Sequence, residues 1–313
     1  MTFRRLCRGF VILLSASLLC GYATDSTGLT RDNALSRIGV LVIAHGGSNQ
    51  WNGMVRRAVR AADLDMPTEV ALGMGMHSGE VRRLQEAVDR LERKGVARIV
   101  VVPLLVSSHS EVFRQFEYLF GLRAEAQWRQ AGEPLDLEVP LLLGRALDDD
   151  PLVAEILLER AFALSRSPER ETVILVAHGP NGEADNQRWL EALQRLASHL
   201  TREGTFRQVL SATLRDDAPK PIQEGAARQL REMVRTSSEQ GRTLVVPVLI
   251  ARGGIEEKIP KLLAGLTYVY TGQTLLPHPK LEAWIGQEAL RLAHRETSHE
   301  TKDDGDPSSP VVE

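Results

Sequence analysis

Two short apolar segments each occur twice in the chain, in the same order. The first pair is residues 40–46 (VLVIAHG) and 173–179 (VILVAHG), and the second is residues 99–106 (IVVVPLLV) and 244–250 (LVVPVLI). Uncharged runs of this length are typical of strands buried in a parallel sheet. A histidine stands where each strand of the first pair would end, and open parallel sheets bind ligands at the carboxyl ends of their strands. The repeat therefore predicts two similar α/β lobes, each with an imidazole at its functional edge.

The length and composition fit a globular protein of two domains. The 313 residues suffice for two domains of ordinary size, and the hydrophobic content of 43% supports packed cores. The net charge is −3, from 38 basic and 41 acidic residues, and aromatic residues make up 5% of the chain. Such a chain offers neither a strongly basic surface nor an aromatic stacking platform, so we expect no nucleic-acid partner.

The order of the predicted elements favours two doubly wound parallel sheets flanked by helices. In the first lobe we expect strands at 38–44, 69–74, 98–106 and 137–143, and helices at 54–64, 80–94, 111–131 and 151–164. In the second lobe we expect strands at 172–177, 208–214, 243–251 and 268–275, and helices at 186–200, 221–237, 255–263 and 281–294. The predicted lobes span residues 38–166 and 172–295, with a polar linker at 24–37 and a disordered tail at 296–313.

Residues 1–23 have the pattern of an export signal peptide. Arginines precede a short apolar core at 10–19, and Gly21 and Ala23 are small residues suited to cleavage. The core is short for a membrane span, so we expect no stable span after cleavage and a periplasmic or extracellular protein. The alternatives are an uncleaved anchor and a lipid anchor at Cys20, which disagrees with the large Leu19 before it. The cysteines, Cys7 and Cys20, both fall in this segment, so the mature chain would bind a metal through imidazole or oxygen ligands.

His45 and His109 are the candidate metal and catalytic residues. His45 is followed by Gly46 and Gly47, which let the backbone turn sharply beside a ligand. His109 follows the third predicted strand, so the two imidazoles meet at one carboxyl edge if the first and third strands are neighbours. Two imidazoles with open coordination positions suit Co²⁺, Ni²⁺ or Fe²⁺, and neutral imidazole accepts protons near neutral pH. The alternative for each residue is a structural histidine at a strand end.

The second lobe lacks the matching second imidazole. Alignment of the two Val-Pro strands places Gly253 opposite His109, so His178 has no imidazole partner there. Glu256 or Glu257 is an alternative partner, although glutamates that open a helix are usually solvated. We therefore predict asymmetric lobes, with the stronger divalent-metal site in the first.

Two further histidines, His77 and His278, also follow predicted strands. Each is either an additional ligand at a sheet edge or a loop histidine, and the sequence leaves these roles open. The glycine-rich turns complete neither a P-loop nor a dinucleotide-binding fingerprint, and no serine sits in a nucleophile elbow. These absences argue against nucleotide binding and serine hydrolysis.

Taken in order, these motifs resemble the CbiX-like sirohydrochlorin cobaltochelatases, a family of class II tetrapyrrole chelatases. The resemblance covers roughly residues 38–293 and is carried by residues 42–46 (VIAHG), 101–109 (VVPLLVSSH), 175–179 (LVAHG), 246–250 (VPVLI) and 276–279 (LPHP). It implies two chelatase-like lobes and insertion of a metal into a tetrapyrrole held between them, as in cobalamin biosynthesis. It also implies that His45 and His109 act on the metal and on the pyrrole protons.

The resemblance leaves two functions open. The first is a chelatase, a lyase by class, for Co²⁺ or else Ni²⁺ or Fe²⁺. The family's biosynthetic members are cytoplasmic, whereas this chain carries an apparent export signal. The second is therefore an exported, non-catalytic protein that binds a metal or a tetrapyrrole. Because two lobes in one chain can form the cleft without a partner, we expect a monomer.

Overall fold

The structure, a computed structural model, describes residue 35 and residues 37–73, 78–124 and 132–303. The first half of the chain contains β1 (Ile38–Ala44), α2 (Asn49–Ala61), β2 (Thr68–Leu72), α3 (Ser78–Glu92), β3 (Arg98–Leu104), α4 (Glu111–Leu119), β4 (Leu141–Leu143) and α5 (Pro151–Leu164). The second half contains η2 (Pro168–Arg170), β5 (Glu171–Ala177), α6 (Glu183–Gly204), β6 (Gln208–Thr213), α7 (Lys220–Gln240), β7 (Arg242–Val248), α8 (Ile255–Leu262) and α9 (Pro279–Asp303). The predicted leader lies outside the described residues.

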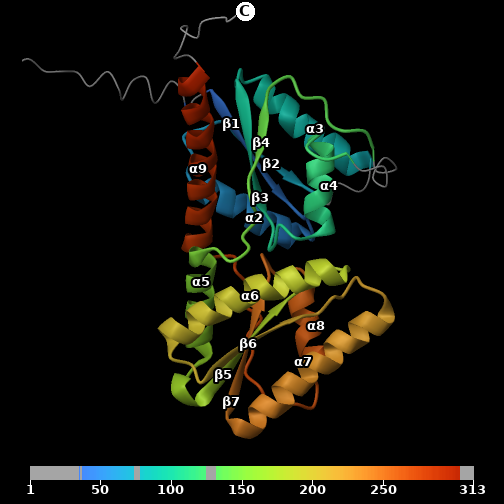
Figure 1. The fold of residues 1–313 in the computed structure, drawn as a ribbon, viewed down its shortest axis with the longest axis vertical. Helices are drawn as coiled ribbons and strands as arrows, with labels where there is room; N and C mark the ends of the chain where they lie inside the picture. Colours follow the sequence, from blue (N-terminus) through green and yellow to red (C-terminus); the bar gives the residue numbers. More distant parts are fainter. Residues whose placement is uncertain (1–34, 36, 74–77, 125–131, 304–313) are drawn as a thin grey trace, which may run out of the picture.

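Each half builds one parallel sheet, and the two sheets share the order of three strands, with a fourth strand in the first sheet (Figure 1). The strand orders are β2-β1-β3-β4 and β6-β5-β7, so the strand that ends in Ala-His-Gly is paired on both sides in each sheet. Ala44 pairs with Leu104, and Ala177 pairs with Val248, so the two sheets also share their register. The half-repeat in the sequence therefore corresponds to two lobes of one α/β architecture, as predicted.

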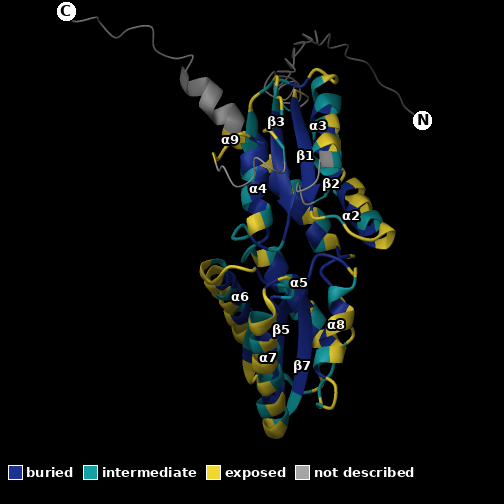
Figure 2. Ribbon diagram, turned by 90° about the vertical axis from the view of Figure 1, so that its right-hand side faces the viewer, coloured by how far each residue is buried: buried dark blue, intermediate teal, exposed yellow. Residues whose placement is uncertain are grey.

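Alternate residues of the two central strands face different cores. Val40, Val42 and Ala44 of β1 belong to the same core as Val173, Leu175 and Ala177 of β5. The intervening residues face two separate cores, one under α3 and α4 and the other under α7 and α8. Figure 2 shows the central strands as buried along their length. One hydrophobic core therefore runs through both lobes. It receives alternate residues of β1 and β5, because a strand alternates its side chains between the two faces of its sheet.

The helices that end the two halves are exchanged between the sheets. Helix α5 packs on α6 and β7 of the second sheet, whereas α9 packs on β3 and α2 of the first (Figure 1). The sequence-based placement of the helix at 151–164 in the first lobe and of the helix at 281–294 in the second is therefore wrong. Close approach of α9 to the first sheet requires Gly144, where a Cβ would lie 2.7 Å from Glu288 Oε1 and 3.0 Å from Val101 O. An apolar helix face does not specify which of two similar sheets it will cover.

Several predicted elements differ in extent, for local reasons. The helix predicted at 111–131 ends at Leu119, shortly before Gly121 takes a left-handed φ of +70°. The strand predicted at 268–275 is a single bridge between Leu244 and Val269, and Gly272 with φ +68° turns the chain soon after it. The strand predicted at 137–143 begins only at Leu141, after a proline that has no N–H to donate to a ladder.

The predicted disordered tail is partly helical. Its first eight positions, 296–303, continue the backbone of α9, which ends at Asp303, so the predicted boundary at 295 is wrong. Across the ranges that the structure describes, no helix is both long and apolar enough to cross a membrane.

Candidate functional site

His45 follows β1 directly, at the carboxyl edge of the first sheet. Gly46 has a φ of +77°, and a Cβ at this position would lie 3.0 Å from the backbone nitrogen of Gly73. Glycine is therefore required both by the left-handed backbone and by the close approach of the neighbouring strand end. The turn leads into α2, where the Ser48 hydroxyl accepts a hydrogen bond from Trp51 N at 3.2 Å. This geometry leaves His45 exposed at the edge.

The turn also orients the imidazole ring of His45. Nδ1 lies 2.8 Å from the Gly46 carbonyl oxygen, which can only accept, so Nδ1 carries the hydrogen. The lone pair of Nε2 is then available to a metal ion or a proton. His178 repeats the arrangement, with Nδ1 2.9 Å from the Gly179 oxygen and Gly179 at φ +77°. Both lobes therefore present the same ring nitrogen.

His109 lies in the loop after β3, which is paired with β1. The two histidines thus follow neighbouring strands at the same edge, which confirms that part of the prediction; their joint catalytic role stays a prediction. The loop is anchored within the first lobe by Ser108, whose backbone N and hydroxyl donate to Asp148 at 2.8 and 2.7 Å. His109 N donates to Ser107 Oγ at 3.1 Å.

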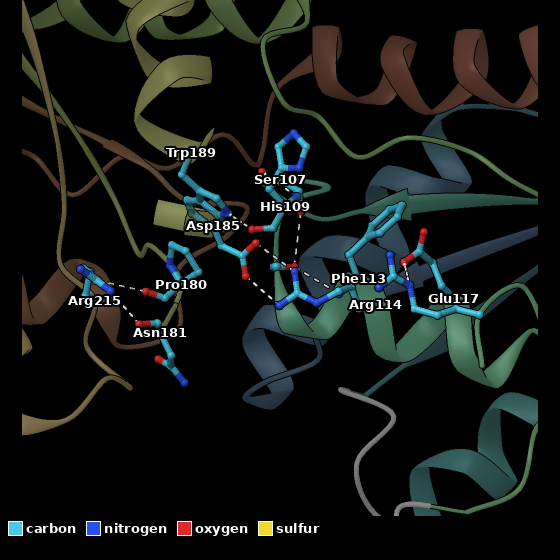
Figure 3. A network of polar contacts seen from close by, with 12 residues as sticks. Ser107, His109, Phe113, Arg114, Glu117, Pro180, Asn181, Asp185, Trp189 and Arg215 are labelled. Atoms are coloured by element: carbon cyan, nitrogen blue, oxygen red, sulfur yellow. Dashed lines mark hydrogen bonds and ion pairs between the residues drawn. The ribbon is translucent and has the colours of Figure 1, made fainter. Parts of the chain in front are cut away.

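The second lobe contacts this loop directly (Figure 3). The indole Nε1 of Trp189, on α6, donates to the backbone oxygen of His109 at 2.7 Å. A short distance along α4, the Arg114 guanidinium donates two hydrogen bonds to the Asp185 carboxylate on α6, at 2.9 and 2.7 Å. Bidentate pairs of this kind are geometrically specific. The carboxyl edge of the first sheet is therefore built jointly by both lobes.

The second lobe carries a cluster of three possible metal ligands. Within the described residues, His178, Asp216 and Asp217 are the group whose ligand atoms all lie within 4.8 Å of one another. His178 Nε2 is 3.3 Å from Asp217 Oδ2. Because Nδ1 already donates to a carbonyl, the Nε2 lone pair faces a carboxylate, and this arrangement of ligand atoms suits a metal ion. Asp216 is also paired with the Lys258 ammonium, which offsets part of the negative charge.

The two carboxylates were not predicted from the sequence. Asp216 and Asp217 follow β6, which pairs with β5, so they share the carboxyl edge with His178. The signal in the sequence is their place after a strand that can pair with the central strand on its other side, as His109 follows the strand on the first side. In the first lobe the corresponding segment, after β2, carries His77, which lies outside the described residues.

The structure explains why the second lobe has no counterpart of His109. Gly253 follows Val248 at the same spacing as His109 follows Leu104, so the two positions are equivalent. A Cβ at Gly253 would lie 2.9 Å from Cδ1 of Trp51, which comes from α2 of the first lobe. The tryptophan therefore occupies the space that an imidazole would need.

The remaining candidates have structural partners. Glu256 is buried, and its carboxylate accepts hydrogen bonds from the backbone N of Gly253 and Gly254 at 3.0 and 2.9 Å, which caps α8. It is therefore not the solvated glutamate that the sequence predicts. His278 is buried, accepts from Lys280 N with Nδ1 at 3.2 Å, and has Nε2 3.0 Å from Glu159 Oε2. Both of its nitrogens are engaged, so it joins α5 to the start of α9.

Two solved chelatase structures resemble the whole two-lobed arrangement. SirB from Bacillus subtilis with Fe³⁺ has a TM-score of 0.61 at 16% identity and matches 83% of this chain and 97% of its own. The structure of CbiX, described as the terminal enzyme for biosynthesis of siroheme in denitrifying bacteria, has a TM-score of 0.52 at 16% identity. It matches 81% of this chain and 98% of its own. The fold of this chain is therefore similar to the fold of these two chelatases.

Sequence similarity to known chelatases lies in the first lobe. The CbiX family model matches residues 39–164. A sirohydrochlorin cobaltochelatase of Methanococcoides burtonii is 23% identical over 127 residues, which is 40% of this chain and 95% of that protein. The first lobe is therefore a CbiX-like domain, and it contains both His45 and His109.

Proposed function

We propose that this chain is a chelatase that inserts a divalent metal ion into sirohydrochlorin or a related tetrapyrrole. The observation that carries the proposal is a CbiX-family domain in which β1 and β3 bring His45 and His109 to one carboxyl edge. The tetrapyrrole and the metal ion are the substrates, and the space beside the two carboxyl edges is the proposed place of reaction.

The chemistry asks for groups that bind a cation and accept protons. Insertion forms bonds between the metal ion and the pyrrole nitrogens and releases two N–H protons. Nε2 of His45 has its lone pair free, because Nδ1 donates to Gly46 O. A neutral imidazole held this way can take a metal ion from water or accept a pyrrole proton near neutral pH. We assign His45 and His109 to these two tasks jointly.

Co²⁺ is the first metal to test. The relative from Methanococcoides burtonii is named as a cobaltochelatase, and the SirB structure contains Fe³⁺. Imidazole ligands also suit Ni²⁺ and Fe²⁺, so the ligand type does not select among the three. We propose Co²⁺ with Ni²⁺ and Fe²⁺ as alternatives, and a monomer as the working unit.

The decisive experiment is insertion by purified protein without the predicted leader. Sirohydrochlorin is mixed under anaerobic conditions with each of the three metal ions, and the change in its visible spectrum is followed. We expect insertion well above the rate without protein, lost in His45→Ala and in His109→Ala. His199→Ala is the matched control, because His199 lies on α6 and contacts Arg202 there. A wild-type rate equal to the rate without protein would contradict the proposal.

The alternative is an exported protein that binds a metal ion or tetrapyrrole without inserting one into the other. The basic start and short apolar core of residues 1–23 favour this function. It predicts stoichiometric binding of Co²⁺ or sirohydrochlorin without the spectral change of insertion. The proposed periplasmic or extracellular location is tested by N-terminal sequencing of protein from fractionated cells, where an intact Met1 in the cytoplasm would refute it.

A further inference from the structure

The loop that carries His109 is held from both lobes. On its own side, Ser108 is tied to Asp148 and its hydroxyl accepts from Ala146 N at 2.9 Å. On the other side, Trp189 Nε1 donates to His109 O at 2.7 Å. Among the described residues, Trp189 is the donor of the hydrogen bond that the His109 carbonyl oxygen accepts. The backbone of the candidate catalytic residue is therefore fixed by a side chain of the second lobe.

Trp189 is built to hold this position. Its side chain is 7% exposed and belongs to the core that runs through both lobes, so the indole ring has little freedom to move. Nearby, the Arg114 and Asp185 pair fixes α4 against α6, as Figure 3 shows. A short hydrogen bond from a buried indole restrains the peptide group of His109 more tightly than a solvent contact would. The backbone position from which the imidazole side chain extends is restrained with it.

The molecule contains its own control for this contact. Trp51 is the counterpart on the other lobe, because it comes from the helix after the His45 turn and packs on Gly253, the position equivalent to His109. That contact is one of packing: within the described residues, the Trp51 indole nitrogen makes no hydrogen bond to the Gly253 loop. Each tryptophan thus contacts the lobe opposite its own, but Trp189 supports an imidazole and Trp51 excludes one.

We propose that Trp189 is a positioning residue, which sets the place of His109 from across the lobe interface. A competent pair of His45 and His109 then exists only while α6 is seated against the loop after β3. The proposal rests on the proposed function for the role of His109, and it adds that the first lobe's site depends on a hydrogen bond from the second lobe.

The test compares Trp189→Phe with Trp51→Phe in the protein without its leader. Both changes keep an aromatic ring, but only the first removes the hydrogen bond to His109. In the metal-free protein we expect the ¹H–¹³C resonance of the His109 ring to move in Trp189→Phe and to stay in place in Trp51→Phe. No movement in the first, or equal movement in both, would overturn the proposal. This readout does not require any chelatase activity.

Metal binding separates positioning from general stability. We expect Trp189→Phe to weaken Co²⁺ binding about three- to tenfold, the range of one lost hydrogen bond. Combined with His109→Ala, it should cause no further loss, because it acts through that residue. Additive losses would mean a merely structural role. Wild-type protein that fails to bind Co²⁺ would refute the proposed function, while the resonance test still decides the positioning.

If Trp189→Phe does not fold, the wild-type protein still provides an answer. The indole N–H of Trp189 should exchange with solvent more slowly than that of Trp51, and its resonance should shift in His109→Ala. Exchange at equal rates without such a shift would overturn the proposal.

Discussion

The two lobes share the order and register of three strands and their His-Gly turn, yet they surround the turn histidine differently. In the first lobe, His45 has a second imidazole on the neighbouring strand's loop. In the second lobe, His178 faces Asp217 and Asp216, and the place of the second imidazole is taken by Trp51. The comparison teaches that the repeated strands fix where a ligand group stands, whereas the loops beyond the strands decide which ligand it is.

The first prediction, with the largest expected effect, tests which lobe holds the metal ion. His45→Ala and His109→Ala should each weaken Co²⁺ binding about 100-fold or more, since removing a ligand costs more than altering a group that only supports one. His178→Ala should leave most of the affinity. Calorimetric titration of the three variants measures this directly.

The outcome also ranks the two sites. Equal losses in all three variants would indicate one site shared across the lobes. A loss confined to His178→Ala, repeated in Asp217→Asn, would move the site to the second lobe and reverse the predicted asymmetry.

The second prediction tests whether the lobes are separable units. Gly144→Ala places a Cβ 2.7 Å from Glu288 Oε1 and 3.0 Å from Val101 O, so the buried Glu288 side chain on α9 must move away from the first sheet. We expect a loss of about 2 kcal/mol in the free energy of unfolding, with a single transition retained because both lobes share one core. Denaturant unfolding followed by circular dichroism measures both quantities.

The matched control is Gly225→Ala in the interior of α7, where a Cβ would have only Arg228 Nη2 as a neighbour, at 3.9 Å. It should stabilise the protein by up to about 1 kcal/mol, since alanine is the better helix former. Two separate transitions in either protein would show that the lobes unfold independently.

The third prediction attempts to make the lobes alike. Gly253→His restores the imidazole that the second lobe lacks, but its Cβ would lie 2.9 Å from Trp51. We expect destabilisation of about 1–3 kcal/mol from overpacking. Gly253→His should cost less when Trp51→Ala is already present, because the two side chains compete for the same space. Thermal unfolding of the two single variants and the double variant gives the coupling. Strict additivity would mean that Trp51 is not what keeps the position small.

The fourth prediction concerns pH and has the smallest effect. Hydrogen bonds from Lys280 and His278 lower the pKa of the Glu159 carboxyl, which joins α5 to α9. A lowered pKa in the folded protein gives stability that is present above the unfolded pKa and is lost as the pH falls through the folded value. Glu159→Gln should therefore lower the free energy of unfolding at pH 7 by about 1 kcal/mol or less, and with it the melting temperature. The difference between variant and wild type should vanish at acidic pH; a difference that persists there would contradict this account.

Local sequence pattern predicted the strands that matter most for the site. The four buried runs became β1, β3, β5 and β7, because continuous apolar sequence has few alternatives in a folded chain. The sequence joined His45 to His109 only on the condition that the first and third strands are neighbours, and the pairing of β1 with β3 meets that condition. Asp216 and Asp217 escaped notice because neither residue lies in a motif, and only the pairing of β6 with β5 brings them beside His178.

The sequence by itself determined the repeated strands, the left-handed His-Gly turns and the absence of an imidazole at position 253. These are local properties, set by apolar runs, by the freedom of glycine and by residue identity. Only the tertiary structure decided that α5 and α9 exchange sheets, that Trp51 fills the space beside Gly253, and that Trp189 supports His109. Each of these depends on which of two similar surfaces a segment packs against, and that choice is made by shape and hydrogen bonding over distances that a local pattern does not encode.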